Sequence, residues 1–243
     1  MPHIVLDRVS KSYGADYALR DVTVHFADAV TTAVVGPSGS GKSTLVQMIN
    51  GLVRPSAGSV HVFGQPIDYD RLPKLRRQIG YAVQGTGLFP HLSVAHNITL
   101  LARLTGWDDA KADTRARELM GQVGLPWDYA SRYPHELSGG QQQRVGLCRA
   151  MMLGPPVFLL DEPFGALDPV TRRDIHGEFR RLQAAEPRTM ILVTHDLPEA
   201  LKLAQHLVVL NRGQVAQHGP CAEVVEKPAS DFVRDFLQSQ LKD

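Results

Sequence analysis

The stretch from Gly36 to Thr44 constrains this chain more than any other part of its sequence. It reads GPSGSGKST, follows the apolar run TTAVV and precedes the helical run LVQMINGL. A G-x-x-x-x-G-K-S loop between a buried strand and a helix is the pattern of a phosphate-binding loop. Its glycines let backbone N–H groups converge on phosphate oxygens, and the start of the helix adds a favourable dipole. The simpler alternative is a glycine-rich turn that only caps a helix.

Two side chains of this loop have specific predicted tasks. Lys42 is expected to reach the β and γ phosphates of a nucleotide, as a binding and a catalytic residue, and the Ser43 hydroxyl to ligate Mg²⁺. The other predicted nucleotide-binding positions of the loop are Gly36, Pro37, Ser38, Gly39, Ser40, Gly41 and Thr44.

Length and composition indicate a globular chain with one large domain or two small ones. The chain has 243 residues, of which 43% are hydrophobic and 21% charged, and single domains of this type extend to roughly 250 residues. Its 26 basic and 25 acidic residues give a formal net charge of +1, which argues neither for a nucleic-acid binder nor for an acidic tail, and we expect no nucleic-acid partner. Local geometry must therefore hold any anion that the chain binds.

Neither the cysteines nor the N-terminus indicates secretion or a membrane span. Cys148 falls in a helical pattern and Cys221 in an expected loop, without metal-site spacing. We therefore expect a reducing compartment and ordinary packing instead of a disulfide. The first residues carry charges where a signal peptide needs an apolar core, and no run approaches the ~20 apolar residues of a membrane helix.

Strand-like and helix-like runs alternate along much of the chain, which predicts an α/β fold with a central, mainly parallel sheet. The runs TTAVVG and VFLLDE are apolar without alternation, as strands buried on both faces should be. The alternating early runs, including TVHFADAV over residues 23–30, are expected to form an antiparallel sheet beside it.

The predicted domain is a single cassette with one helical insertion. Residues 1–87 and 138–219 are expected to form the α/β core with its β-subdomain. Strand signals vanish over residues 88–137, which we interpret as an inserted α-helical subdomain. Residues 220–243 form a C-terminal tail with one short helix, for which Ser230 is the expected N-cap.

A second motif is the run VFLLDE, which ends in two acidic residues, Asp161 and Glu162. A parallel strand delivers its C-terminal residues to the crevice where a nucleotide binds. Asp161 is expected to hold Mg²⁺ through water, and Glu162 to polarise the attacking water as a general base. The alternative is that both carboxylates merely cap the turn at Pro163.

A third motif, Ser138-Gly139-Gly140-Gln141, opens the helical run QQQRVGLCRAMML. Backbone N–H groups and a serine hydroxyl again meet at a helix N-terminus, which favours an anion. The sequence thus predicts two phosphate-binding places in one chain. A P-loop kinase would leave the second one unexplained.

Together the three motifs resemble an ATP-binding cassette (ABC) ATPase, and the resemblance extends over nearly the whole chain. It implies the P-loop NTPase fold, ATP and Mg²⁺ as ligands, and ATP hydrolysis. In that family the serine-glycine signature covers the ATP held by a second subunit. The resemblance therefore implies a homodimer that forms on ATP binding, with two half-sites around two ATP molecules.

The resemblance also assigns roles to isolated residues. Tyr13 matches the aromatic residue that stacks on adenine, although an aromatic near a strand end is equally expected in a core. Gln84 matches the residue that links Mg²⁺ and the attacking water to the membrane partner; alone it would be an ordinary polar loop residue. Asp168 matches the loop between subunits. His195 matches the histidine that contacts the γ-phosphate, where spacing alone favours a structural role.

Within the family, the chain resembles the nucleotide-binding subunit of a binding-protein-dependent importer. Residues 88–98, 161–172 and 227–236 are similar to importers of quaternary amines such as glycine betaine, choline and carnitine. The resemblance implies integral membrane permease subunits as partners, indirectly a substrate-binding protein, and a position on the cytoplasmic face of the membrane. Import of another solute, such as an amino acid, a sulfonate or a phosphonate, stays open. A soluble ABC ATPase of translation or DNA repair fits less well.

Overall fold

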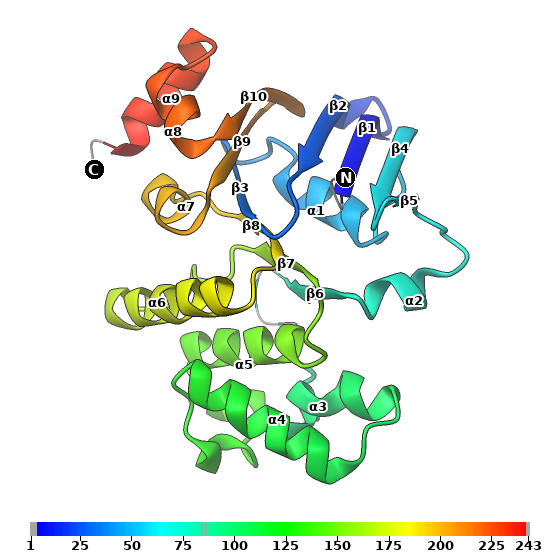
Figure 1. Ribbon diagram of the computed structural model, residues 1–243, viewed down its shortest axis with the longest axis vertical. Coiled ribbons are helices and arrows are strands. Elements are labelled where there is room, and N and C mark those ends of the chain that lie inside the picture. Colours follow the sequence, from blue (N-terminus) through cyan, green and yellow to red (C-terminus); the bar gives the residue numbers. More distant parts are fainter. Residues whose placement is uncertain (1–3, 84, 86, 242–243) are drawn as a thin grey trace. The chain divides into compact units, whose positions relative to one another are not determined.

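The computed structural model describes residues 4–83, 85 and 87–241, which fall into two compact units (Figure 1). The first unit combines the chain up to Arg76 with the chain from Pro187 onward, and the second comprises Arg77–Glu186. The predicted insertion boundaries, 88 and 137, both lie inside the second unit.

An antiparallel sheet forms part of the first unit, as the alternating early runs predicted. Its strand order is β2-β1-β4-β5, and Ile4 pairs with Phe26 on one side and with Val62 on the other. The strand expected over residues 23–30 starts earlier and ends at Phe26, because Ala29 adopts a left-handed φ of 56° and turns the chain. The strands are β1 (Ile4–Tyr13), β2 (Asp16–Phe26), β4 (Ala57–Val62) and β5 (Gln65–Pro66).

A second set of strands in this unit pairs mainly in parallel. β3 pairs in parallel with both β8 and β9, and β10 pairs antiparallel with β9. Every residue of β3 and β8 is buried, as strands covered on both faces should be. The strands are β3 (Thr31–Val35), β8 (Thr189–Val193), β9 (His206–Asn211) and β10 (Gln214–Pro220).

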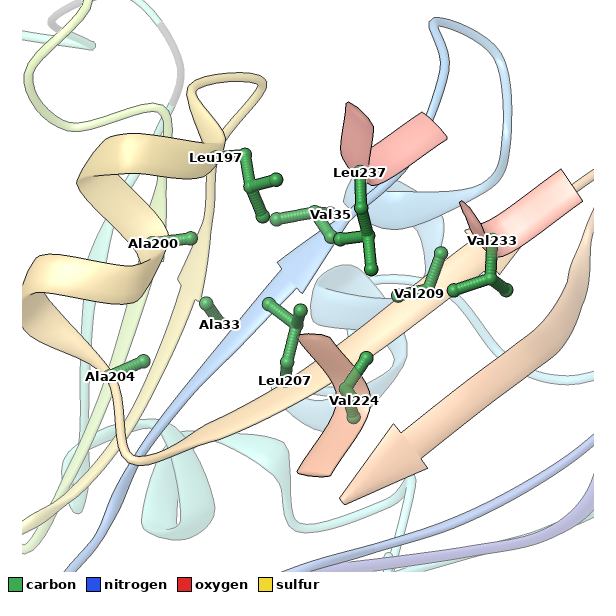
Figure 2. Close-up of a cluster of buried hydrophobic side chains, with 10 residues drawn as sticks. All are labelled: Ala33, Val35, Leu197, Ala200, Ala204, Leu207, Val209, Val224, Val233 and Leu237. Atoms are coloured by element: carbon green, nitrogen blue, oxygen red, sulfur yellow. The ribbon is translucent and has the colours of Figure 1, made fainter. Parts of the chain in front are cut away.

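Helices of the C-terminal tail close the hydrophobic core of the first unit. Figure 2 shows side chains of β3 and β9 meeting those of three helices. Val224, Val233 and Leu237 supply the contacts of the tail. The helices of this unit are α1 (Lys42–Ile49), α2 (Leu72–Arg76), α7 (Leu197–Leu203), α8 (Cys221–Glu226) and α9 (Asp231–Leu241).

The tail was predicted only in part. Ser230 caps α9 as expected, since its hydroxyl accepts a hydrogen bond from the Val233 backbone N–H at 3.3 Å. The expectation of one helix and of a loop at Cys221 was wrong, because Cys221 opens the short helix α8. That helix buries Val224 as its single apolar anchor, which leaves too little periodicity in the sequence to predict it.

Both cysteines are free thiols. Cys148 is buried in α5, and burial raises the pKa of its thiol well above the usual range. Burial also raises the pKa of Cys221 to about 11. Both thiols therefore stay protonated at neutral pH, as ordinary packing groups do.

The second unit is mostly helical and contains two parallel strands. β6 pairs with β7, and helices α3, α4 and α5 pack together (Figure 1). Within the described residues, no helix has both the length and the apolar character that crossing a membrane requires. The elements are β6 (Ile79–Ala82), β7 (Val157–Asp161), α3 (Val94–Leu104), α4 (Asp109–Gln122), α5 (Gly139–Met151), α6 (Pro169–Ala185) and the 3₁₀ helices Trp127–Tyr129 and Pro134–Glu136.

Candidate nucleotide-binding site

The loop between β3 and α1 is closely packed at its glycines. Gly36 has φ 151°, and a Cβ atom there would lie 2.2 Å from the Leu210 carbonyl oxygen. Gly41 has φ 101°, and a Cβ atom there would lie 2.4 Å from the Ala18 carbonyl oxygen. A side chain at either position would displace backbone, so the loop requires glycine at both.

The ammonium group of Lys42 is folded over the start of this loop. Its Nζ atom donates hydrogen bonds to the carbonyl oxygens of Gly36 at 2.8 Å and Pro37 at 2.9 Å. Lys42 also opens α1, whose N-cap is Gly41, a residue without a side chain that could cap the helix. The loop thus presents a cation and the amides of a helix N-terminus together, which suits a phosphate group.

His195 emerges at the same edge of the sheet as this loop. β8 lies parallel to β3, and Val193 pairs with Val34 at the ends of these strands. His195 follows β8 as Gly36 follows β3, and its side chain is exposed. The first unit therefore brings the predicted γ-phosphate histidine to the edge that carries the phosphate-binding loop.

Hydrogen bonds on both sides of His195 fix its backbone. The buried Thr194 hydroxyl donates to the Glu199 carboxylate at 2.5 Å and accepts from the Asp196 backbone N–H at 3.1 Å. Asp196 caps α7 by accepting from the Glu199 backbone N–H at 2.8 Å. Sequence reasoning missed Thr194 and Glu199, although Asp196 followed by Glu199 is a capping pattern that could have indicated them.

Tyr13 lies at the end of β1 and is 55% exposed, so it is not a core aromatic. The neighbouring strand β2 contacts the phosphate-binding loop, since a Cβ atom on Gly41 would lie 2.6 Å from Leu19 Cδ2. The hairpin that carries Tyr13 therefore packs against that loop within the first unit.

In the second unit, Asp161 ends the buried strand β7 and Glu162 follows it. Asp161 is only 2% exposed, whereas Glu162 is half-buried. Glu162 adopts φ 49°, a left-handed conformation that costs a residue with a side chain about 1 kcal/mol or more. Backbone strain of this kind concentrates at functional sites, where the surrounding structure holds a side chain in a required direction.

Ser138 and Gln141 begin helix α5 in the same unit. The Ser138 hydroxyl accepts a hydrogen bond from the Gln141 backbone N–H at 3.3 Å, and the Gln141 side chain accepts one from the Ser138 backbone N–H at 2.9 Å. This capping box uses the amides of Ser138 and Gln141. The amides of Gly139 and Gly140 lie between them in the first turn, where helices offer donors to an anion.

Asp168 follows a loop that packs against α5. The Gln143 side chain accepts a hydrogen bond from the Ala166 backbone N–H at 3.1 Å. Asp168 accepts hydrogen bonds from the backbone N–H groups of Val170 at 3.1 Å and Thr171 at 3.0 Å, and so caps the start of α6. Hydrogen bonding from Thr171 lowers the pKa of the Asp168 carboxyl.

The predicted residues thus gather in two groups. The first unit contains the phosphate-binding loop, Tyr13 and His195, and the second contains Asp161 and Glu162 at the end of β7, the Ser138–Gln141 motif and Asp168. Gln84, the remaining predicted site residue, lies outside the described residues.

The chain is similar to known ATP-binding proteins of transporters. The family model described as ABC transporter matches residues 19–165. The glycine betaine uptake system ATP-binding protein YehX of Escherichia coli (strain K12) is 48% identical over 234 residues, or 96% of this chain and 76% of that protein. The choline transport ATP-binding protein OpuBA of Bacillus subtilis (strain 168) is 44% identical over 235 residues, or 96% of this chain and 62% of that protein.

Solved structures support the same assignment. A dimeric structure of the ATP-binding cassette MJ0796, in a post-hydrolysis state bound to ADP and Pi, has a TM-score of 0.85 and 32% identity, and covers 89% of this chain and 98% of that chain. This likeness confirms the predicted α/β cassette fold. With the family match over residues 19–165 and the 48% identity to YehX, it shows that the chain belongs to the ABC transporter family.

Proposed function

We propose that this chain is the ATP-hydrolysing subunit of an importer and that it powers uptake of a quaternary amine. The observation that carries the proposal is the phosphate-binding loop, where Gly36 and Gly41 admit no side chain and Lys42 folds over the loop. The similarity to importer ATP-binding proteins over 96% of the chain supports the transport role.

The loop and the residues near it would bind ATP. Lys42 and the amides at the start of α1 would hold the β and γ phosphates, and Tyr13 would stack on the adenine. Ser43, Asp161 and Gln84 would hold Mg²⁺, whose oxygen-rich coordination suits a hydroxyl, a carboxylate and an amide. When bound, Mg²⁺ supplies positive charge that stabilises the phosphate oxygens.

Hydrolysis would depend on groups that face the γ-phosphate. Glu162 would accept a proton from the attacking water as general base. Lys42 and His195 would stabilise the charge that develops on the phosphate oxygens. The hydrogen bonds around Thr194 would hold His195 in place for this task, and Gln84 would orient the water.

The second half of each site would come from another copy of the chain. Ser138, Gly139, Gly140 and Gln141 would contact the γ-phosphate held by the partner, and Asp168 would lie at the seam between the copies. ATP would therefore close a homodimer, and hydrolysis would let it open, which gives the bistable interface that transport coupling needs.

The remaining partners follow from the transport role. The chain would sit on the cytoplasmic face of the cell membrane, held by integral permease subunits that meet the region of Gln84 and residues 88–137. A separate binding protein would deliver the solute, and a nucleic-acid partner is not expected at a net charge of +1.

The solute assignment rests on kinship, because this subunit would not contact the solute. The relatives at 48% and 44% identity are named for glycine betaine and choline. Both are quaternary ammonium compounds, which aromatic cages recognise through cation–π contacts. The competing solutes are amino acids, sulfonates and phosphonates, carried by the same machinery.

Reconstitution of the complete complex in vesicles tests the proposal. We expect ATP-dependent uptake of labelled glycine betaine, choline or carnitine, and no uptake by a complex that carries Glu162→Gln. Uptake of a different solute alone would overturn the quaternary-amine assignment. Uptake that continues without ATP, or that Glu162→Gln leaves intact, would overturn the energising role.

A further inference from the structure

Lys11 makes a contact on β1 that the nucleotide-binding motifs do not include. Its Nζ atom lies 5.0 Å from the centroid of the Tyr13 ring. The same atom donates a hydrogen bond to the Arg54 carbonyl oxygen at 3.0 Å. The ammonium group is therefore anchored to the segment that follows α1 while it lies over the aromatic ring.

The two side chains share one face of the strand. Lys11 and Tyr13 are two apart in β1, and although the pairing of β1 with β2 shifts between Lys11 and Ser12, the Lys11 ammonium lies over the Tyr13 ring. Lys11 pairs with Leu19 of β2, which lies against Gly41 of the phosphate-binding loop. The Lys11–Tyr13 pair therefore lies on the hairpin that contacts this loop.

A cation over an aromatic ring is attracted by the negative face of the ring. The Lys11 ammonium takes one face of Tyr13, yet the residue stays 55% exposed. A planar base can therefore stack only on the face that the cation leaves open. Holding the ring also reduces the rotational freedom that Tyr13 would lose on binding.

We propose that Lys11 is a positioning residue for the base of the nucleotide: its ammonium holds the Tyr13 ring so that adenine stacks on the opposite face. This inference rests on the proposed adenine-binding role of Tyr13. The free energy of an exposed cation–π pair corresponds to a change of about two- to fivefold in a binding constant. Lys11 therefore tunes nucleotide affinity without taking part in hydrolysis.

The same hairpin offers a matched control. The Arg20 guanidinium lies 5.7 Å from the centroid of the Tyr17 ring, a second exposed cation–aromatic pair. Tyr17 pairs with Ser12, so this second pair contains neither Lys11 nor Tyr13. Arg20→Met thus removes an equivalent pair and leaves the Lys11–Tyr13 pair intact.

Binding of ADP and of pyrophosphate to the purified chain separates the base from the phosphates, and neither ligand permits hydrolysis. Lys11→Met should raise the Kd for ADP about two- to fivefold and leave the Kd for pyrophosphate unchanged. Lys11→Arg keeps a cation and should bind ADP with the wild-type Kd. Arg20→Met should change neither the Kd for ADP nor the Kd for pyrophosphate. For ATP hydrolysis, Lys11→Met should raise KM and leave kcat unchanged.

A double-mutant cycle with Tyr13→Ala decides whether Lys11 acts through the ring. We expect Tyr13→Ala to weaken ADP binding and Lys11→Met to have no further effect in that background. An equal effect of Lys11→Met with and without Tyr13, or an equal loss of pyrophosphate affinity, would overturn this inference alone. An unchanged Kd for ADP in Tyr13→Ala would instead overturn the proposed role of Tyr13.

Discussion

The side chains of Ser138 and Gln141 each accept a hydrogen bond from the backbone of the other, at 3.3 Å and 2.9 Å. This reciprocal pair fixes the first turn of α5 before any ligand binds. The proposed contact with a partner's ATP is therefore preorganised. The free energy needed to order this turn is spent during folding and does not weaken dimer formation.

Ser138→Ala should have two separable effects. Loss of the cap should lower the free energy of unfolding by about 1 kcal/mol. Loss of the hydroxyl should also weaken ATP-dependent dimerisation, measured by light scattering in a Glu162→Gln background. Ser93→Ala is the control for loss of a cap, because the Ser93 hydroxyl accepts a hydrogen bond of 3.3 Å from the His96 backbone N–H at the start of α3 and also lies 2.8 Å from His96 Nδ1. It should cost similar stability and leave dimerisation intact; dimer loss in both variants would contradict the role of Ser138.

Gly36→Ala should abolish nucleotide binding because the added Cβ would lie 2.2 Å from the Leu210 carbonyl oxygen. The variant should also lose more than ~1 kcal/mol of unfolding free energy, since φ 151° disfavours alanine.

Gly177→Ala in α6 is the control: among the described residues nothing lies within 4 Å of its added Cβ, so stability should rise by about 0.5–1 kcal/mol. Calorimetry with ATP and urea unfolding measure both effects. Wild-type ATP affinity in Gly36→Ala would contradict the loop assignment.

Which features of the structure could be predicted from the sequence depends on whether the residues in contact are neighbours in the chain. The loop before Lys42 could be predicted because its glycines, its lysine and its helix are adjacent in the chain. The packing of Leu19 on Gly41 could not, since only the folded hairpin brings these residues together. Likewise, the position of Tyr13 near a strand end leaves core and surface equally open, and Val224 alone is too weak a pattern to predict α8.

Glu162→Gly should lose hydrolysis without losing stability. Glycine adopts φ 49° without the steric cost that a Cβ atom imposes. We therefore expect the glycine variant to be more stable to urea than Glu162→Gln by about 0.5–1 kcal/mol, because glutamine retains the strain. A glycine variant less stable than the glutamine variant would show that Glu162 is not strained by its backbone.

Asp168 should contribute a pH-dependent term to stability. Hydrogen bonding from Thr171 lowers its pKa in the folded chain, so its stabilisation is present above the unfolded value of about 3.9 and is lost as the pH falls through the lower folded pKa. Asp168→Asn keeps a capping oxygen but cannot titrate, so this term should vanish. NMR titration measures the pKa directly, and Thr171→Val should raise it towards 3.9. An Asp168 pKa at or above that value would contradict the capping geometry.

The proposed closure of two chains around ATP has the most direct test in the mass of the Glu162→Gln protein in solution. This variant should bind ATP without hydrolysing it, because an amide cannot act as the base. Light scattering should then report a monomer without nucleotide or with ADP, and a dimer with ATP. A protein that binds ATP and stays monomeric, or that dimerises equally with ADP, would contradict the account.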